Sequence, residues 1–303
     1  MYCKFVDQFI GAIDVCSETV GCRVARAGTD YARYGPRIEL KRAGVKPGLI
    51  AILVVGATIL QTSAALADTV PVRHTEGLMH GFLVLRTLEG KTIADGEIEQ
   101  DAHGDRVTAH LIFRFKDGSI YEDTTTFSQR GTFRLLSDHL IQRGPSFKQS
   151  VDTLIDASTG QVKVRYTEDN GKEKVIAQRL DLPPDVANGL LFTLMKDVKP
   201  SVPQTMVSIV AITPKPRLVK LAIIPQGEEP FKIGSFRHKA MHYVVKVEIG
   251  GAAGFLARLM GKQPPDSHVW VLDGEAPAFV KSEGPLYAGG PIWRIQLASA
   301  GLF

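Results

Sequence analysis

The sequence predicts a mainly β protein, a large curved antiparallel sheet (half-barrel or barrel) with one or two packed helices. First, apolar and polar residues alternate with a period of two through most of residues 68–303, as in strands with one buried face. Second, turn residues separate the runs, most clearly at Asp117-Gly118 and Asn170-Gly171, which are hairpin signals. Third, helical spacing dominates only over residues 184–199. About a dozen antiparallel strands cannot stay flat and open, so we expect the sheet to curl or close.

The expected strands follow one another with short turns between them. Arg106–Lys116 alternates most clearly, with Val107 and Phe113 on one face and His110 and Arg114 on the other. Short connections join antiparallel neighbours in a meander, whereas parallel strands need long crossovers. The expected strands are 78–88, 91–100, 106–116, 120–129, 132–142, 149–156, 161–167, 172–180, 205–213, 217–224, 235–249, 268–272, 278–283 and 291–297.

One helix is expected over residues 184–199, packed against the sheet. Pro183 and Pro184 suit its first turn, and Asp185 suits the positive end of its dipole. Apolar residues then recur at helical spacing, and Pro200 ends the pattern. These apolar positions are Val186, Leu190, Leu191, Leu194, Met195 and Val198.

Residues 45–67 have the layout of a secretory signal peptide. Basic residues up to Lys46 precede an apolar run from Leu49 to Leu60, and Ala65-x-Ala67 follows. This order predicts cleavage after Ala67, and the run is shorter than the roughly 20 residues of a spanning helix. We therefore expect a periplasmic or secreted protein. The alternative is an uncleaved membrane anchor that holds the domain outside the cytoplasm, with membrane contact through residues 48–67 alone.

Residues 1–44 form an N-terminal extension that carries all three cysteines, Cys3, Cys16 and Cys22. Because a signal peptide normally opens a chain, one interpretation is a translation start at Val45. The other is a genuine tail before an anchor. Residues 68–303 are enough for a single β-rich domain, and they contain no cysteine. That composition excludes disulfides, thiol nucleophiles and cysteine-based metal sites from the domain.

The charge of the domain argues against nucleic acid as a partner. Residues 1–67 hold 8 of the 36 basic and 5 of the 32 acidic side chains, so the remainder has a net charge near +1. The charges are scattered, without the basic run that binding to phosphates requires.

The motifs predict neither a metal site nor a cofactor. His238 and His242 are four residues apart, but in a strand that separation spans about 13 Å, too far for joint chelation of one ion. Gly254…Gly261-Lys262 lacks the spacing and the Ser or Thr of a phosphate loop. The chain has no Gly-x-Ser-x-Gly elbow of a serine hydrolase.

Two C-terminal segments supply the candidate ligand-binding residues. The segment 250–261 is either a short helix or an apolar connection, and residues 277–295 cluster Gly, Pro and aromatics between strands. Such a cluster either lines a ligand mouth or closes a corner of the sheet, and Gly and Pro in strands favour the corner. The candidates are Phe255, Leu256, Leu259, Met260, Trp270, Tyr287 and Trp293.

The ending Gly284-Pro285-Leu286-Tyr287 … Gly290-Pro291-Ile292-Trp293-Arg294 resembles a family of uncharacterised exported bacterial β-rich proteins. That resemblance implies no catalytic residue. A looser architectural likeness is to the half-barrels that carry lipids or lipoproteins in the periplasm. We therefore expect an envelope protein that binds a lipid or other hydrophobic molecule in a cavity of the curved sheet. The alternatives are an envelope hydrolase using histidine and carboxylate chemistry, and a structural protein-binding module.

Overall fold

The computed structural model describes residues 69–168, 170–212, 215–233, 236–248 and 264–298. They belong to the compact unit Ala65–Phe303. The predictions for residues 1–67 and for the segment 250–261 fall outside the described residues. In the part of the chain that is described, no helix combines the length and the hydropathy that a membrane crossing requires.

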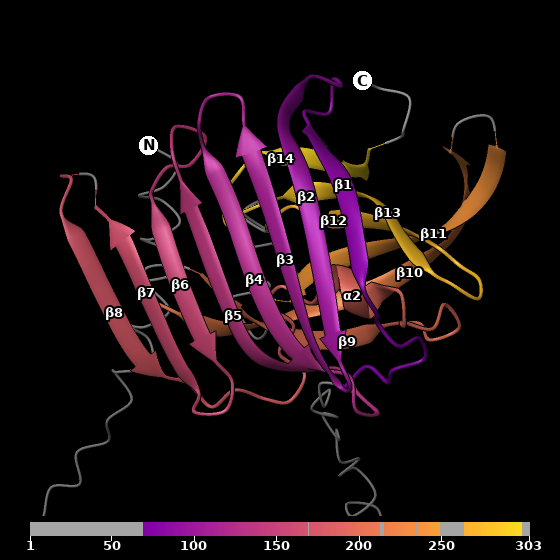
Figure 1. Ribbon diagram of the computed structural model, residues 1–303, viewed down its shortest axis with the longest axis horizontal. Coiled ribbons are helices and arrows are strands. Elements are labelled where there is room, and N and C mark those ends of the chain that lie inside the picture. Colours follow the sequence, from indigo (N-terminus) through magenta and orange to yellow (C-terminus); the bar gives the residue numbers. More distant parts are fainter. Residues whose placement is uncertain (1–68, 169, 213–214, 234–235, 249–263, 299–303) are drawn as a thin grey trace, which may run out of the picture. The chain divides into compact units, whose positions relative to one another are not determined.

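The fold is one 14-stranded antiparallel sheet in the order β8-β7-β6-β5-β4-β3-β2-β1-β14-β13-β12-β11-β10-β9. Strands β1 to β8 form a meander that runs away from the middle of the sheet. Strands β9 to β14 form a second meander that returns, and β14 pairs with β1 (Figure 1). The strands are β1 Met79–Arg86, β2 Thr92–His103, β3 Arg106–Phe115, β4 Ile120–Ser128, β5 Arg134–Arg143, β6 Val151–Asp156, β7 Gln161–Thr167, β8 Glu173–Arg179, β9 Thr205–Ala211, β10 Arg217–Ile233, β11 Phe236–Glu248, β12 Ser267–Leu272, β13 Ala278–Pro285 and β14 Ile292–Leu297.

The predicted mainly β class, with its curved antiparallel sheet, is confirmed. The sheet is curved but not closed, because β8 and β9 stand at its two ends. Both predicted hairpin turns form: Gly118 and Gly171 take positive φ angles of 84° and 81°, which glycine adopts at little cost. Strand β10 runs past its expected end at Ile224, through a register shift between Pro225 and Gly227.

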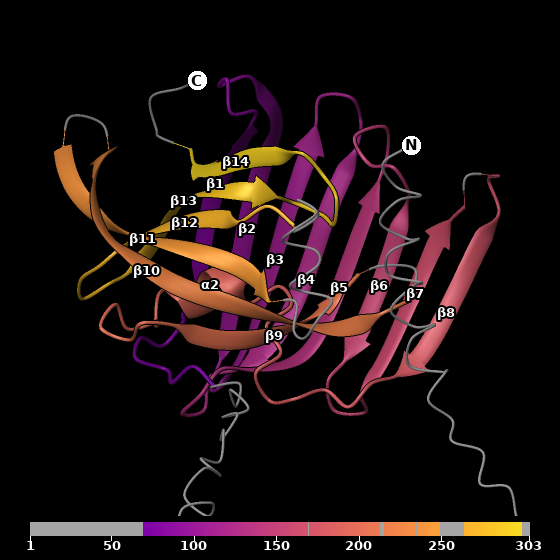
Figure 2. The ribbon, with the colours of Figure 1, turned by 180° about the vertical axis from the view of Figure 1, so that it is seen from behind.

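The two half-sheets, β1–β8 and β9–β14, face each other across a shared apolar core (Figure 2). The largest buried cluster takes Phe127 and Val164 from one half, Ile223 and Tyr243 from the other, and Leu190 from the segment between them. A second cluster, around Phe113 and Trp293, lies where β1–β5 meet β14. The alternation predicted for Arg106–Lys116 holds, since Val107 and Phe113 are fully buried.

The predicted helix over residues 184–199 is wrong in extent. Only α2, Leu191–Met195, is helical; we call residues 183–200 the plug. Before α2 the chain instead pairs with β9: Val186 forms a parallel bridge with Ser208, and the Ala187 N–H donates to the Ser208 carbonyl at 2.8 Å. The apolar spacing is compatible with a helix, but an open strand edge has unpaired N–H and C=O groups that the plug satisfies.

Polar side chains complete this cover over β9. The Ser208 hydroxyl donates to the Asp185 carboxylate at 2.8 Å. The Asn188 side-chain amide donates to the Val210 carbonyl at 3.0 Å, while its oxygen accepts from the Val210 N–H at 2.7 Å. The plug therefore acts as a partial further strand, and the edge at β9 is covered.

A buried carboxyl pair lies beneath the plug. Asp123 and Asp138 are 8% and 1% exposed, and the Thr125 hydroxyl donates to Asp138 at 3.0 Å. Burial, then the neighbouring Asp138 charge, raises the pKa of Asp123 well above its usual value. Burial also raises the pKa of Asp138. The two carboxyl groups also share a hydrogen bond, and ionising both in a buried site is unfavourable, so this environment favours one shared proton.

We predict that Asp123→Asn raises the thermal unfolding midpoint at pH 8 by a few degrees and leaves it nearly unchanged at pH 4. A carboxyl whose folded pKa is raised binds its proton more tightly in the folded state. Its contribution to stability therefore falls as pH rises from about 4, the unfolded value, through the folded pKa. The asparagine amide does not ionise and can still donate to Asp138. Thermal melts at both pH values provide the measurement.

Asp152→Asn is the matched control, because Asp152 is a half-exposed carboxyl in the next strand pair. It should show no comparable gain at pH 8. An equal gain for Asp123→Asn at pH 4 and pH 8 would contradict the shared-proton interpretation.

Gly189 marks the closest approach of the plug to this pair. Its φ is +65°, and an added Cβ would lie 1.7 Å from the Thr125 hydroxyl oxygen and 2.7 Å from an Asp138 oxygen. Gly171 also has a positive φ, but no atom lies within 4 Å of the position of its Cβ.

Alanine substitutions at Gly171 and Gly189 distinguish the cost of backbone strain from the cost of steric overlap. We expect Gly171→Ala to cost about 1–2 kcal/mol, the penalty of a left-handed residue with a Cβ. Gly189→Ala should cost about 4 kcal/mol or more, because it adds steric overlap in a buried site. Chemical denaturation of both variants measures the difference. Equal losses would mean that the plug does not rest on Thr125.

Candidate ligand site

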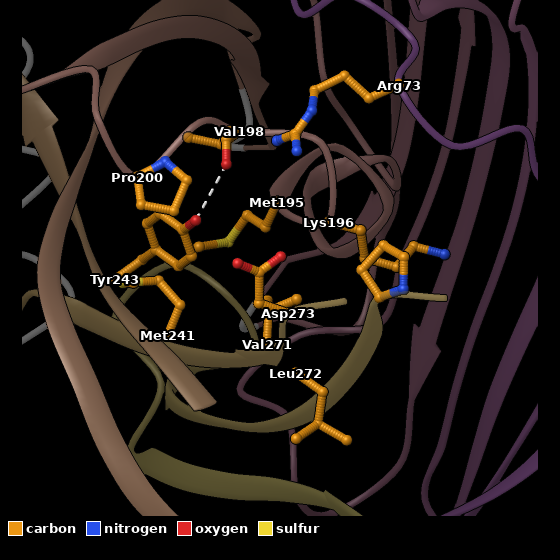
Figure 3. A pocket seen from close by; sticks show the side chains of 11 residues that line it. Arg73, Met195, Lys196, Val198, Pro200, Met241, Tyr243, Val271, Leu272 and Asp273 are labelled. Carbon is orange, nitrogen blue, oxygen red and sulfur yellow. Dashed lines mark hydrogen bonds between the residues drawn. The ribbon is translucent and has the colours of Figure 1, made fainter. Parts of the chain in front are cut away.

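A cleft opens where the plug meets β11 and the end of β12 (Figure 3). Most of its lining residues are apolar, and most of these belong to the main core, although polar atoms make up more of its accessible surface, and the Asp273 carboxylate points inward. Two cationic residues, Arg73 and Lys196, also line it. The apolar lining residues are Met195, Val198, Pro200, Met241, Tyr243, Val271, Leu272 and Pro277.

The segment 69–78, which we call the strap, fixes one side of this cleft. The Asp197 carboxylate accepts hydrogen bonds from the backbone N–H groups of Arg73 and His74, the latter at 2.8 Å. Lys196 forms a buried ion pair with Glu76, and Glu76 also accepts from Gln100 at 2.9 Å. Burial raises the pKa of Asp197, and the two backbone donors oppose that effect. The strap thus ties the plug to the first half-sheet.

Tyr243 ties the plug to the second half-sheet. Its hydroxyl donates to the Val198 carbonyl at 3.0 Å. Burial, and then the charge of Asp273, raises the pKa of Tyr243 to about 12, so the phenol is neutral and remains a donor at physiological pH. Arg73 is different: its side chain is exposed, and its guanidinium makes one long contact, 3.5 Å, to the Asp197 carbonyl. Arg73 is therefore the cation of this cleft best placed to meet a ligand.

The cleft is small as it stands. Its volume is about 10 Å³, close to the minimum for one water molecule. A lipid chain cannot enter unless the plug shifts. A second hollow, between the β5–β6 loop and the β7–β8 turn, has a volume of about 520 Å³ and a lining that includes Phe147, Lys148 and Glu168. It is large enough for a small ligand.

Of the predicted ligand-binding residues that the structure describes, Tyr287 and Trp293 lie together and Trp270 lies elsewhere. Phe255, Leu256, Leu259 and Met260 lie outside the described residues. Tyr287 and Trp293 pack together in the second core cluster, with ring centroids 6.1 Å apart. They match the sheet-corner interpretation of that segment.

Trp270 belongs instead to a polar cluster on the opposite face of the second half-sheet. His242 stacks on the Trp270 ring with centroids 4.5 Å apart and planes at 4°, and the Lys281 ammonium lies 3.7 Å from a Trp270 ring centroid. The Trp270 indole N–H donates to Glu229 at 2.7 Å. The other Glu229 oxygen lies 2.9 Å from His242 Nδ1, and His242 Nε2 lies 2.9 Å from His268 Nδ1.

These contacts determine which ring nitrogens of the two histidines carry protons. A carboxylate only accepts, so neutral His242 donates from Nδ1 to Glu229 and its Nε2 accepts from His268 Nδ1–H. His268 Nε2 is then left with a lone pair. Burial, opposed mainly by Glu229, lowers the pKa of His242, which keeps it neutral at pH 7. A carboxylate–histidine–histidine chain of this kind can present a basic nitrogen.

The sequence analysis rejected His238 and His242 as joint ligands and indicated no other pair of histidines. His238 and His242 both lie in β11, as expected, but His238 opposes Phe231, whereas His242 opposes Trp270 on β12. The partner of His242 is His268, 26 residues away. Only the register of β11 on β12 brings them together, and no local spacing signals it.

No family model matches the chain, and no curated protein matches it. The chain is similar to a crystal structure described as a beta-barrel-like protein of domain of unknown function DUF1849 from Brucella abortus. The TM-score is 0.43 at 10% identity, and the match covers 75% of this chain and 98% of the other.

We predict that tryptophan fluorescence follows the titration of His242. A protonated imidazole stacked on an indole quenches the indole fluorescence, so the emission should fall as the pH is lowered. The midpoint should lie below about 6.5, the ordinary histidine value, because the pKa of His242 is lowered. A pH titration of intrinsic fluorescence measures this. His242→Gln should remove the transition, while His110→Gln, on the other half-sheet, should preserve it. A transition that survives His242→Gln would refute the assignment.

Proposed function

We propose that this is an exported envelope protein that binds a hydrophobic molecule with an acidic headgroup. The apolar tail would lie between the plug and the second half-sheet, and the headgroup would meet Arg73. The observation that carries the proposal is the cleft itself, in which an exposed guanidinium stands beside a wall continuous with the main apolar core. Such a pairing of apolar wall and polar contact is typical of small-molecule sites. Export rests on the segment that ends at Ala67.

Entry of a tail requires the plug to separate from the sheet. The helix of the plug has five residues, and two backbone–backbone hydrogen bonds, both to Ser208, tie the plug to β9. Met195 and Met241 line the cleft, and methionine side chains repack readily around a new shape. Opening would replace contacts between the plug and β11 with contacts to the ligand tail.

The first test is native mass spectrometry of the chain, recovered from an envelope fraction and then incubated with palmitate or with uncharged hexadecanol. We expect palmitate to be retained more strongly. Arg73→Gln should weaken palmitate binding by about tenfold, the loss of one charge-assisted hydrogen bond, and leave hexadecanol unaffected. Arg130→Gln, an exposed arginine paired with Asp105, is the matched control and should change neither.

A cross-link tests the movement of the plug. Val186→Cys and Ser208→Cys join bridge partners, in a background with Cys3, Cys16 and Cys22 replaced by serine. Oxidation should block palmitate uptake and reduction should restore it. A bare polypeptide mass with no uptake of either ligand, or uptake indifferent to oxidation, would reject binding beneath the plug.

The Glu229–His242–His268 chain favours a second candidate, an envelope hydrolase. His268 Nε2 would act as a general base on a bound substrate. Turnover of an ester or amide panel that is lost with His268→Gln, but kept with His139→Gln, would support it. No turnover by the intact protein would count against it.

A further inference from the structure

The outer face of the first half-sheet carries a row of histidines. His80 on β1, His110 on β3 and His139 on β5 occupy one row across the strands, with Glu99 opposite His80 and Thr124 between the other two. Each histidine pairs with a carboxylate of the next strand. The His80–Glu97, His110–Glu122 and His139–Asp152 nitrogen–oxygen distances are 2.8, 2.9 and 3.0 Å.

The His80 pair differs from the other two because a second carboxylate converges on it. Glu97 and Glu99 lie two residues apart on β2, so both side chains leave the same face. The His80 Nε2 atom is 2.8 Å from Glu97 Oε1 and 4.0 Å from Glu99 Oε1. In the described part of the chain, these three side chains form the group whose histidine and carboxylate donor atoms all lie within 4.8 Å of one another.

We propose that His80, Glu97 and Glu99 bind a divalent transition-metal ion, with zinc as the favoured metal. Donor atoms about 2.0–2.2 Å from zinc, at tetrahedral angles, stand about 3.3 Å apart. The His80–Glu97 distance is shorter than this value and the His80–Glu99 distance is longer, so small side-chain rotations would bring all three donors to one zinc ion. One neutral imidazole and two carboxylates suit Zn²⁺ or Mn²⁺, whereas Mg²⁺ and Ca²⁺ prefer oxygen donors alone.

Two further side chains contact the donors. The Phe82 ring lies 4.9 Å from the His80 ring, and the Arg114 guanidinium lies 3.5 Å from Glu97. His80, Glu97 and Glu99 side chains are 51%, 30% and 60% exposed, which leaves room for water to complete the coordination. This is the pattern of an open site.

The sequence could not show this site. It predicted no metal because the histidine spacing in the chain is unfavourable. The ligands come from two strands of a hairpin, and only the β1–β2 register, with His80 opposite Glu99, aligns them.

The test is zinc titration of the full chain in which Cys3, Cys16 and Cys22 are replaced by serine, using competition with a chromophoric chelator. We expect one zinc per chain at this site. His80→Gln and Glu99→Gln should each weaken binding tenfold or more, since even loss of an outer-shell partner costs about 10–100-fold in metal affinity. His139→Gln is the matched control: it removes a histidine from an equivalent pair that lacks a third ligand, and it should leave the affinity unchanged within twofold. Mg²⁺ should not compete.

Three results would overturn the proposal. One is no saturable zinc binding. Another is a loss in His139→Gln as large as in His80→Gln, which would indicate adventitious binding to surface histidines. A third is an unchanged affinity in Glu99→Gln. Circular dichroism confirms folding of each variant, and X-ray absorption of the zinc-loaded protein supplies a second measurement: a shell of nitrogen and oxygen with a single imidazole supports the assignment, and several imidazoles contradict it.

Discussion

The fold depends on the plug, because it meets two demands that the sheet cannot meet by itself. Two half-sheets that curve toward each other need apolar material between them, and Leu190, Leu194 and Met195 supply it. An open sheet also ends in unpaired backbone groups, and residues 185–188 pair with those of β9. One short segment thus fills the interior and covers an edge. This dual role explains why the segment does not continue as a helix, since a helix would satisfy its own backbone and leave β9 bare.

The cost of this arrangement is a set of buried polar groups, and each finds its partner when the plug lies in the position that the structure shows. Asp185, Asn188 and Asp197 are nearly inaccessible and bond to backbone or hydroxyl groups at fixed positions. Apolar packing alone tolerates sliding, whereas a buried amide or carboxylate shifted by one residue loses its partner and its hydration together. The polar contacts therefore set the register of the plug, and the apolar contacts provide most of its binding energy.

Strand positions follow from the sequence because their signals are local. Alternation within Arg106–Lys116 and the Gly118 and Gly171 turns each depend on a few neighbouring residues, and all form as predicted. The plug was mispredicted because residues 186–198 have the same apolar spacing in a helix and in an irregular core segment, and a non-local strand edge decides between them. The side-chain clusters are non-local too. His242 meets His268 through the register of β11 on β12, and His80 meets Glu97 through the register of β1 on β2. The candidate residues in 250–261 lie outside the described part of the chain.

The two faces of the sheet therefore have separate chemistry for one geometric reason. Successive side chains alternate, so each strand that contributes a core residue also contributes a neighbour to the outer face. The inner faces converge and become apolar. The outer faces diverge and remain exposed to solvent, so charged and imidazole side chains can line up across neighbouring strands there. The other end strand of the described sheet, β8, fits the same logic: Glu173, Lys174 and Arg179 place charges along it, which discourages pairing with another strand. The two edges are thus protected from further strand pairing in different ways, β9 by the plug and β8 by charged side chains. The outer face remains as the surface where polar ligands can bind without disturbing the core.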